Sequence, residues 1–270
     1  MKKQLVPFLL LTLLTAGLYA QVPVKTLKQT LKLVISDSNG RNGAAVAWHP
    51  VQKKYYAAMA GNAVFPLMIF DATGKKVNPK PLETGFDIRG LWYNPISKTL
   101  QMNGYADYGW AEYKLDTKGL PTGVNTLLEG QNQPDYQSAG AYNHTEKKVY
   151  FFNSDGDVDV YDAKKGTLEK TIPLRLGIAK GEESEMDDNY EVIEDYNTSN
   201  LVYTGIKKAE IGLLNSWSRE IELYDQASGY LVRKLKLPEE APVESVLNFS
   251  FANGRYWLFD ITNRCWYGYQ

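Results

Sequence analysis

Residues 139–172, AGAYNHTEKKVYFFNSDGDVDVYDAKKGTLEKTI, contain the pattern that decides the fold. An aromatic residue leads into a polar turn, an apolar strand, a turn of Asp and Gly, and a second strand that ends at Asp162. A turn with Gly166 and a Lys-containing strand complete the stretch. Short strands separated by Asn, Asp and Gly predict tight antiparallel hairpins, because these residues adopt the backbone angles that such turns need. The stretch therefore predicts one four-stranded sheet, with strands a, b, c and d in chain order.

Similar copies of this pattern fill the chain, and the last copy is incomplete. Their lead aromatic residues lie about 50 residues apart, at Trp48, Tyr93, Tyr142, Tyr196 and Phe251. Their closing turns run from an Asp to a Gly, at Asp71–Gly74, Asp116–Gly119, Asp162–Gly166 and Asp225–Gly229. In the fourth copy we place the turn between strands a and b at TSN, residues 198–200.

This period is typical of propeller blades. One such sheet cannot bury both of its faces alone, so the copies must pack around a common axis. The chain resembles the β-propeller superfamily, and in architecture it is similar to the NHL, YVTN and WD40 propellers. The Gly-His and Trp-Asp dipeptides of WD40 blades do not occur in the matching places. The prediction is an all-β fold with five four-stranded antiparallel blades.

The two ends of the chain are predicted to meet in one blade. The last copy ends after its strand c, CWYGYQ, residues 265–270. Residues 26–36, TLKQTLKLVIS, show the alternating apolar and Lys pattern of the other outer strands. We expect this N-terminal segment to supply strand d of the last blade. Such pairing removes the sheet edge that an open ring would leave exposed.

Residues 1–20 have the features of a secretory signal peptide. Lys2 and Lys3 precede an apolar run, Leu5–Leu14, and Ala20 fits the last position before cleavage. The run is shorter than the ~20 residues that a membrane helix needs, so no membrane span is expected. No Cys ends the run, which argues against a lipoprotein anchor. We expect a bacterial-type signal at 1–20, one propeller domain at 21–270, and a secreted or periplasmic location.

Charge and cysteine content exclude some classes of partner and stabilisation. The formal net charge is −1, which gives no basic footprint for a nucleic acid. Cys265 is the only cysteine, so an internal disulfide is excluded.

The long connections are predicted to gather on one face of the ring. In a blade the b–c and d–a connections share one face, and the a–b and c–d turns share the other. The long connections are of the first kind, at 61–66, 106–109, 130–137, 175–189 and 207–218. Because function concentrates in such loops, we expect a non-catalytic binding or scaffold module that takes a glycan, peptide or protein there. The candidate ligand contacts are Tyr105, Tyr108, Tyr136, Trp217 and Arg89.

A carbohydrate-active enzyme is the alternative function. Asp87, Glu191 and Glu244 could project near the mouth of the axial channel. A glycoside hydrolase needs two carboxylates either ~5–5.5 Å or ~6.5–9.5 Å apart. The acidic residues on the predicted inner strand of the fourth copy have a competing interpretation, in which they form an ion pair with Arg89.

No metal or other cofactor is predicted, with calcium as the one open alternative. NSDGDVDVYD, residues 153–162, has the acidic content of a calcium loop. The EF-hand pattern requires Gly at its sixth position, and counting from Asn153 that position is Val158. The repeat instead predicts a hairpin with Gly156 at its turn, which leaves Asp155 and Asp157 as a calcium alternative on the long-loop face.

Overall fold

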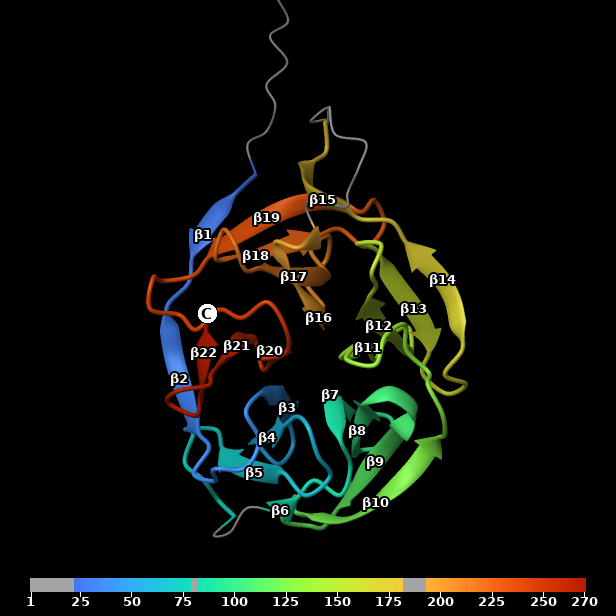
Figure 1. The fold of residues 1–270 in the computed structure, drawn as a ribbon, viewed down its shortest axis with the longest axis vertical. Coiled ribbons are helices and arrows are strands. Elements are labelled where there is room, and N and C mark those ends of the chain that lie inside the picture. Colours follow the sequence, from blue (N-terminus) through green and yellow to red (C-terminus); the bar gives the residue numbers. More distant parts are fainter. Residues whose placement is uncertain (1–21, 79–81, 182–192) are drawn as a thin grey trace, which may run out of the picture.

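The computed structural model describes residues 22–78, 82–181 and 193–270. These residues form five sheets arranged around one axis, as Figure 1 shows. Each blade places its strand a beside the axis and its strand d at the rim. The fold is a five-bladed β-propeller, as the repeat predicts. Among the described residues, no helix is long and apolar enough to cross a membrane.

The blades follow one another in chain order, and each is antiparallel from strand a to strand d. Blade one contains β3 (Gly43–His49), β4 (Lys54–Met59), β5 (Pro66–Asp71) and β6 (Leu82–Glu83). Blade two contains β7 (Ile88–Asn94), β8 (Thr99–Gly104), β9 (Trp110–Leu115) and β10 (Pro121–Leu128). Blade three contains β11 (Ala141–Asn143), β12 (Lys148–Phe152), β13 (Val158–Asp162) and β14 (Leu168–Ile172). Blade four contains β16 (Tyr196–Tyr203), β17 (Ile211–Asn215), β18 (Glu220–Tyr224) and β19 (Tyr230–Lys236). Blade five contains β20 (Phe249–Ala252), β21 (Arg255–Asp260), β22 (Cys265–Tyr269) and β2 (Gln29–Val34).

The b–c hairpin of blade three confirms the hairpin interpretation of residues 153–162. β12 and β13 pair from Lys148↔Asp162 to Phe152↔Val158. Gly156 takes a φ of 82°, which a residue without a Cβ adopts at no steric cost. The Asn153 carboxamide oxygen accepts the backbone N–H groups of Asp155 and Asp157, each at 3.0 Å. The Asn side chain therefore holds the turn.

In blade four the strands a and b predicted from the sequence are wrong. The a–b turn does not lie at residues 198–200, because β16 continues through them to Tyr203. The segment 207–218, expected as one long loop, contains β17 and leads into a short b–c turn. The lead aromatic residue of this blade is therefore Tyr203 rather than Tyr196. Each of the five a–b turns then contains one non-glycine residue with positive φ, at Lys53, Lys98, Lys147, Lys208 and Asn253.

The ring is closed by the N-terminal strand, as predicted. β2 pairs antiparallel with β22, with Leu33 opposite Trp266 and Val34 opposite Cys265. Leu33 and Trp266 are both fully buried. β2 and the last strand of the chain thus share one sheet and one core, and Figure 1 shows them side by side.

Two additional strands extend blade four. β1 (Val24–Thr26) and β15 (Arg175–Ala179) both run parallel to β19, along different parts of its outer edge. β1 pairs with residues 234–236, and β15 contacts Tyr230 and Leu231. The sequence analysis placed residues 175–179 in a loop and did not foresee either strand. Because β1 and β2 are consecutive, the N-terminal segment ties blade four to blade five.

Buried carboxamides and close backbone contacts join the inner strands of neighbouring blades. The Asn103 carboxamide oxygen accepts the N–H groups of Gly90 in blade two, at 3.0 Å, and Gly140 before blade three, at 2.8 Å. A Cβ on Gly90 would lie 2.6 Å from the Gly140 nitrogen. Glycine at position 90 is therefore required by the close approach of two backbones.

Replacing Gly90 should destabilise the ring at this contact. For Gly90→Ala we expect a loss of about 1–3 kcal/mol in the free energy of unfolding, because backbone must move to admit the methyl group. Gly123→Ala in β10 is the matched control, since a Cβ there meets nothing within 4 Å. It should leave stability unchanged or raise it by about 0.5–1 kcal/mol. Urea unfolding followed by tryptophan fluorescence measures both, and equal midpoints for the two variants would contradict the assignment.

Removing β1 alone, or β1 and β2 together, should separate the contributions of these two strands to stability. A chain starting at Leu27 loses β1 and keeps β2, so we expect cooperative melting at a lower temperature. A chain starting at Asp37 also loses β2, which exposes the edge of β22 and the core around Trp266. We expect that chain to lose its cooperative thermal transition. Differential scanning calorimetry makes the comparison, and a chain without β2 that melts like the intact protein would disprove closure by this strand.

Candidate functional site

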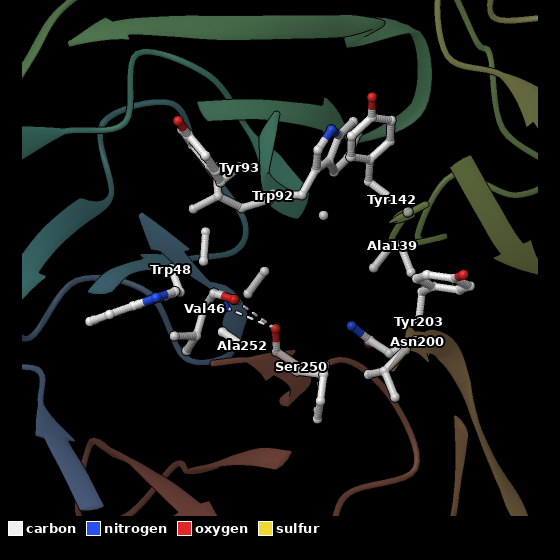
Figure 2. Close-up of a pocket in the computed structure, with 18 of the residues that line it drawn as sticks. Val46, Trp48, Trp92, Tyr93, Ala139, Tyr142, Asn200, Tyr203, Ser250 and Ala252 are labelled. Atoms are coloured by element: carbon white, nitrogen blue, oxygen red, sulfur yellow. Dashed lines mark hydrogen bonds between the residues drawn. The ribbon is translucent and has the colours of Figure 1, made fainter. Parts of the chain in front are cut away.

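A cavity of about 450 Å³ lies at the axial ends of the inner strands, where these strands enter the a–b turns. Residues from β3, β7, β11, β16 and β20 surround it, and Figure 2 shows their side chains around an open centre. This volume is in the range of about 300–1,000 Å³ that is usual for small-molecule sites. The cavity lies on the face with the short turns, opposite the face on which the sequence predicts function.

One half-buried aromatic residue from each blade stands at the rim of the cavity. The five are Trp48, Tyr93, Tyr142, Tyr203 and Phe251. Each packs against another ring, with centroid distances of 4.4 Å for Trp48–Tyr55, 4.2 Å for Tyr93–His49, 6.0 Å for Tyr142–Trp92, 5.5 Å for Tyr203–Tyr150 and 4.9 Å for Phe251–Tyr256. The rings of Trp48 and Tyr93 extend away from the centre (Figure 2). The rim is therefore aromatic and held in place by packing, while the interior remains open.

The interior contains two polar side chains on neighbouring blades. The Ser250 hydroxyl accepts the Val46 N–H at 3.0 Å and donates to the Val46 carbonyl at 3.1 Å, so both of its bonds are used within the ring. Asn200 donates through its Nδ2 to the Phe249 carbonyl at 2.8 Å. The Oδ1 of Asn200 is buried and has no hydrogen-bond partner among the described residues. A buried acceptor without a partner costs free energy.

A bulge in β16 explains how Asn200 reaches the cavity. The Asn197 carboxamide oxygen accepts the N–H groups of Ser199, at 3.2 Å, and Asn200, at 2.9 Å. The register between β16 and β17 shifts between Tyr196 and Leu201. Bulges of this kind redirect a side chain and are frequent beside functional sites. Figure 2 shows Asn200 turned toward the interior. The turn signal at 198–200 therefore marks a bulge within a strand.

A second polar atom of the lining lacks a partner. Trp92 lies on β7, across the cavity from blade four, and is 8% exposed. Its indole Nε1–H is buried and makes no hydrogen bond within the described residues. Both atoms have almost no accessible surface, and the Trp92 ring packs edge-on against Trp110 in the core between blades two and three. Neither residue was predicted as a site residue, because nothing in the repeat distinguishes them from ordinary strand residues.

The lining carries no formal charge. Within the part of the chain that the structure describes, none of the residues around the cavity is Asp, Glu, Lys or Arg. Charged residues make up 23% of the whole chain, so an uncharged lining is a distinctive property of this site. His144, exposed at the rim, is the one histidine among the residues that line the cavity.

At the opposite end of the inner strands, three of the predicted ligand residues come together. The Arg89 guanidinium lies over the Tyr105 ring, 4.6 Å from its centroid, and the Tyr105 and Tyr136 ring centroids are 6.0 Å apart. Arg89 is 3% exposed, and its Nη1 donates to Asp87 Oδ1 at 2.6 Å while its Nε donates to Gln137 Oε1 at 2.6 Å. These contacts use several of the groups that a ligand would have to bind.

The other two predicted ligand residues lie apart from this group. Tyr108 is 47% exposed and packs edge-on against Phe86, with ring centroids 5.6 Å apart. Trp217 is in the b–c turn of blade four and is 82% exposed. Both residues are on the long-loop face.

The carboxylates of the enzyme alternative occupy different environments. Asp87 is 6% exposed, and its Oδ1 accepts both the Arg89 guanidinium and the Gly61 N–H, the latter at 2.9 Å. Glu244 is half-buried, and its backbone carbonyl accepts Nδ2 of Asn197. Glu191 is outside the described residues. Arg89 is therefore paired with Asp87, which directly precedes β7, and this ion pair is structural.

The two Asp residues of the calcium alternative belong to the b–c turn of blade three. Asp155 is exposed, whereas Asp157 is half-buried and its Oδ1 accepts the Leu174 N–H at 3.1 Å. Burial raises the pKa of Asp157 above its usual value. No cluster of three or more potential metal ligands occurs among the described residues.

Comparisons with known proteins agree with the fold. No family model matches the sequence, and no curated protein matches it. The structure is similar to that of glutaminyl cyclase from Myxococcus xanthus, with a TM-score of 0.54, 9% identity, and 93% of this chain and 98% of that chain covered. A nidogen/laminin complex gives a TM-score of 0.45 at 9% identity, covering 74% of this chain and 65% of that one. The β-propeller domain of Cps50 (Swd1) from Myceliophteria thermophila gives 0.45 at 10% identity, covering 84% and 82%. At these identities the similarity concerns the fold alone.

His49, behind the cavity rim, should make stability depend on pH. Burial lowers the pKa of His49 from its usual 6.5, and its Nδ1 accepts the Gln52 N–H at 3.2 Å. As pH falls through 6.5, the unfolded chain binds a proton that the folded protein resists. The free energy of unfolding should therefore decrease below that pH.

His49→Asn tests this titration, because blades two and three carry Asn94 and Asn143 in the same place, each accepting turn N–H groups. The variant should lose less stability than the wild type between pH values of about 7.5 and 5. His144→Asn removes an exposed His and is the control. Urea titrations at each pH give the comparison, and parallel pH profiles for the wild type and His49→Asn would contradict the assignment.

Proposed function

We propose that the protein is a non-catalytic binding module and that its ligand occupies the axial cavity. The observation that carries the proposal is a cavity whose described lining is uncharged and whose rim has an aromatic residue from every blade. Pockets that combine an apolar wall with a few converging polar groups are the usual form of small-molecule sites. In keeping with the signal peptide predicted at residues 1–20, we propose that binding takes place outside the cytoplasm.

The lining favours binding over catalysis. Hydrolysis of a glycosidic bond needs two carboxylates, and the cavity lining has none among the described residues. Cyclisation of a glutaminyl residue, the activity in the name of the Myxococcus protein, needs a positioned side chain that transfers a proton. The described lining contains no Asp or Glu, and its one histidine, His144, lies exposed at the rim. The carbohydrate-active alternative through Asp87, Glu191 and Glu244 therefore receives less support.

A site on the long-loop face is the second candidate. The observation that favours it is the proximity of Arg89, Tyr105 and Tyr136, all three of which are predicted as ligand residues from the sequence. Tyr136 is 53% exposed and presents an aromatic surface to a glycan, peptide or protein. The Arg89 guanidinium, which lies against Tyr105, is already bonded to Asp87 and Gln137, and this lowers the capacity of the site for new polar contacts.

The tryptophan side chains allow the two sites to be distinguished. The chain contains six Trp residues, of which Trp48 and Trp92 line the cavity and Trp217 is on the long-loop face. In a 15N-labelled sample each indole N–H gives a separate signal, assigned by Trp→Phe replacement. We expect fragments from a library of small neutral and charged compounds to move the Trp48 and Trp92 signals and to leave Trp217 unchanged.

The matched variants are Trp48→Ala and Trp217→Ala. Loss of the aromatic rim should weaken fragment binding about tenfold, because well-packed Trp residues contribute strongly to binding energy. Trp217→Ala should bind as the wild type does. Fragments that move only the Trp217 signal and lose affinity in Trp217→Ala would place the site on the long-loop face.

A further inference from the structure

We infer that the face with the short turns docks on the surface of an anionic lipid bilayer, where its lysines contact lipid phosphates and its exposed aliphatic side chains enter the headgroup layer. This inference goes beyond the proposed function, because it concerns the surface around the axial cavity and does not depend on a ligand inside it. The arguments are the distribution of charge, the sequence of the a–b turns, and the aliphatic residues at the tips of these turns.

The formal net charge of −1 conceals an unequal distribution of charge between the two faces. Exposed lysines gather in the a–b and c–d turns, at Lys53, Lys75, Lys98, Lys118, Lys147, Lys164, Lys165, Lys207 and Lys208. None of them forms an ion pair within the described part of the chain. The acidic residues at the same turns are Asp71, Asp116, Glu146, Asp162, Glu210 and Asp225, and all of these except Glu146 are half-buried. The short-turn face is therefore basic.

The acidic side chains of the c–d turns are directed into the turns themselves. Asp71 Oδ1 accepts the N–H groups of Thr73, at 2.9 Å, and Lys75, at 3.1 Å. Asp116 Oδ1 accepts the Lys118 N–H at 2.8 Å. These carboxylates stabilise the turns, whereas the lysine side chains that follow them are exposed. A partner that approaches this face therefore meets ammonium groups before it meets carboxylates.

The long-loop face has the opposite charge. In the described parts of the b–c and d–a connections, the exposed acidic residues are Asp107, Glu129, Asp135, Asp155, Glu194, Glu239 and Glu240. The exposed basic residues in the same connections are Arg41, Arg175 and Lys180. An anionic surface attracts one face of the ring and repels the other, so the distribution of charge also selects the orientation of docking.

The a–b turns of the first four blades carry lysine at a position where the backbone favours a different residue. Lys53, Lys98, Lys147 and Lys208 are equivalent in the repeat, and their φ angles lie between 50° and 63°. Residues other than glycine are uncommon at positive φ, and Asn is enriched among those that occur there. Blade five has Asn253 at a φ of 52° in its own a–b turn. Backbone geometry therefore does not account for the four lysines, whereas a requirement for positive charge on this face does.

Exposed aliphatic side chains lie two residues before three of these lysines. Val51, Ile96 and Ile206 are 78%, 60% and 40% exposed. Asn94 Oδ1 accepts the Ile96 N–H at 2.9 Å, and Thr204 Oγ1 accepts the Ile206 N–H at 3.0 Å, so the turns hold these residues in place. The a–b turns of all blades lie on the same face of the ring. The three aliphatic side chains can therefore meet one extended surface together.

An anionic bilayer satisfies both features of this face. Anionic headgroups attract clustered lysines, and aliphatic side chains gain free energy when they leave water at the boundary with the acyl chains. A soluble polyanion such as a nucleic acid would satisfy the lysines but would leave Val51, Ile96 and Ile206 in water. The axial cavity is lined in part by residues of the a–b turns, so docking would place its mouth against the lipid surface.

Co-sedimentation with lipid vesicles tests the inference. The wild type for this test starts at Gln21, because the apolar run Leu5–Leu14 would itself bind lipid, and this chain retains every residue that the structure describes. We expect it to sediment with vesicles of phosphatidylglycerol and phosphatidylcholine in equal amounts, and to stay in solution with vesicles of phosphatidylcholine alone. Binding should weaken about tenfold or more as NaCl is raised from about 0.05 to 0.5 M, because salt screens the attraction.

The first variant combines Lys53→Asn, Lys98→Asn, Lys147→Asn and Lys208→Asn. It removes four charges and places at each positive φ a residue that the backbone accepts, so the fold should be retained. We expect its binding to anionic vesicles to be at least tenfold weaker. The matched control removes the same number of charges from exposed positions on the outer strands, with Lys25→Gln, Lys32→Gln, Lys170→Gln and Lys236→Gln. This control should bind nearly as the wild type does.

The second variant tests whether the aliphatic side chains enter the lipid. It combines Val51→Thr, Ile96→Thr and Ile206→Thr, because blade three carries Thr145 at the equivalent position. We expect binding to anionic vesicles to be at least fivefold weaker, and any binding to a DNA duplex to be unchanged. The control combines Val64→Thr, Val124→Thr and Val246→Thr, which alter exposed aliphatic residues elsewhere, and it should bind as the wild type does. Thermal melting of every variant verifies that the fold is retained.

The inference is wrong if the protein does not sediment with anionic vesicles, or if it binds neutral vesicles equally well. It is also wrong if either the lysine variant or the aliphatic variant binds anionic vesicles as tightly as the wild type does. Binding to a DNA duplex without binding to vesicles would assign the basic face to a nucleic acid and overturn the lipid surface as the partner. None of these results bears on the axial cavity, which the fragment experiment tests separately.

Discussion

The pairing of β2 with β22 is the constraint on which the propeller depends. A ring of five sheets has no stable starting point, because its first and last blades would each expose a face and an edge. The N-terminal strand joins the C-terminal blade and buries Leu33 against the same core as Trp266. Trp266 in turn contacts blade one, where a Cβ on Gly43 would lie 2.3 Å from the indole ring. Closure of the ring therefore fixes the position of an inner strand, and with it the diameter of the axial cavity.

The inner strands are joined across blades by individual polar groups. Asn103 links Gly90 and Gly140, Asn248 binds the Gly43 N–H at 2.7 Å, and Ser250 binds both backbone groups of Val46. These carboxamides and hydroxyls occupy the space that long side chains would otherwise fill, so the centre stays open. Where such a link uses all of its hydrogen-bonding groups it is structural. Asn200 uses its Nδ2 in the same way but leaves its Oδ1 without a partner, which distinguishes it from the others.

The repeat, the number of blades and the closing strand could be predicted from the sequence, because each rests on local turn chemistry and on alternation along strands. Blade four shows where this reasoning fails. The residues TSN gave a true turn signal, since Asn197 does accept the N–H groups of Ser199 and Asn200. The local bend is a bulge, and pairing with β17 carries the strand through it. Whether a bend ends a strand depends on the neighbouring strand, which local sequence does not encode. The same limit hid Asn200, which the bulge turns toward the cavity.

The two ends of the inner strands differ in charge, and this difference bears on the proposed site more directly than loop length does. At the long-loop end, Arg89 is bonded to Asp87 and Gln137 and covered by Tyr105, so a ligand would have to displace interactions that already exist. At the other end, the described lining contains no Asp, Glu, Lys or Arg, and Ser250 makes both of its hydrogen bonds within the ring. A neutral ligand that occupies this end displaces no ion pair, whereas a charged ligand would lose its hydration without gaining a counter-charge.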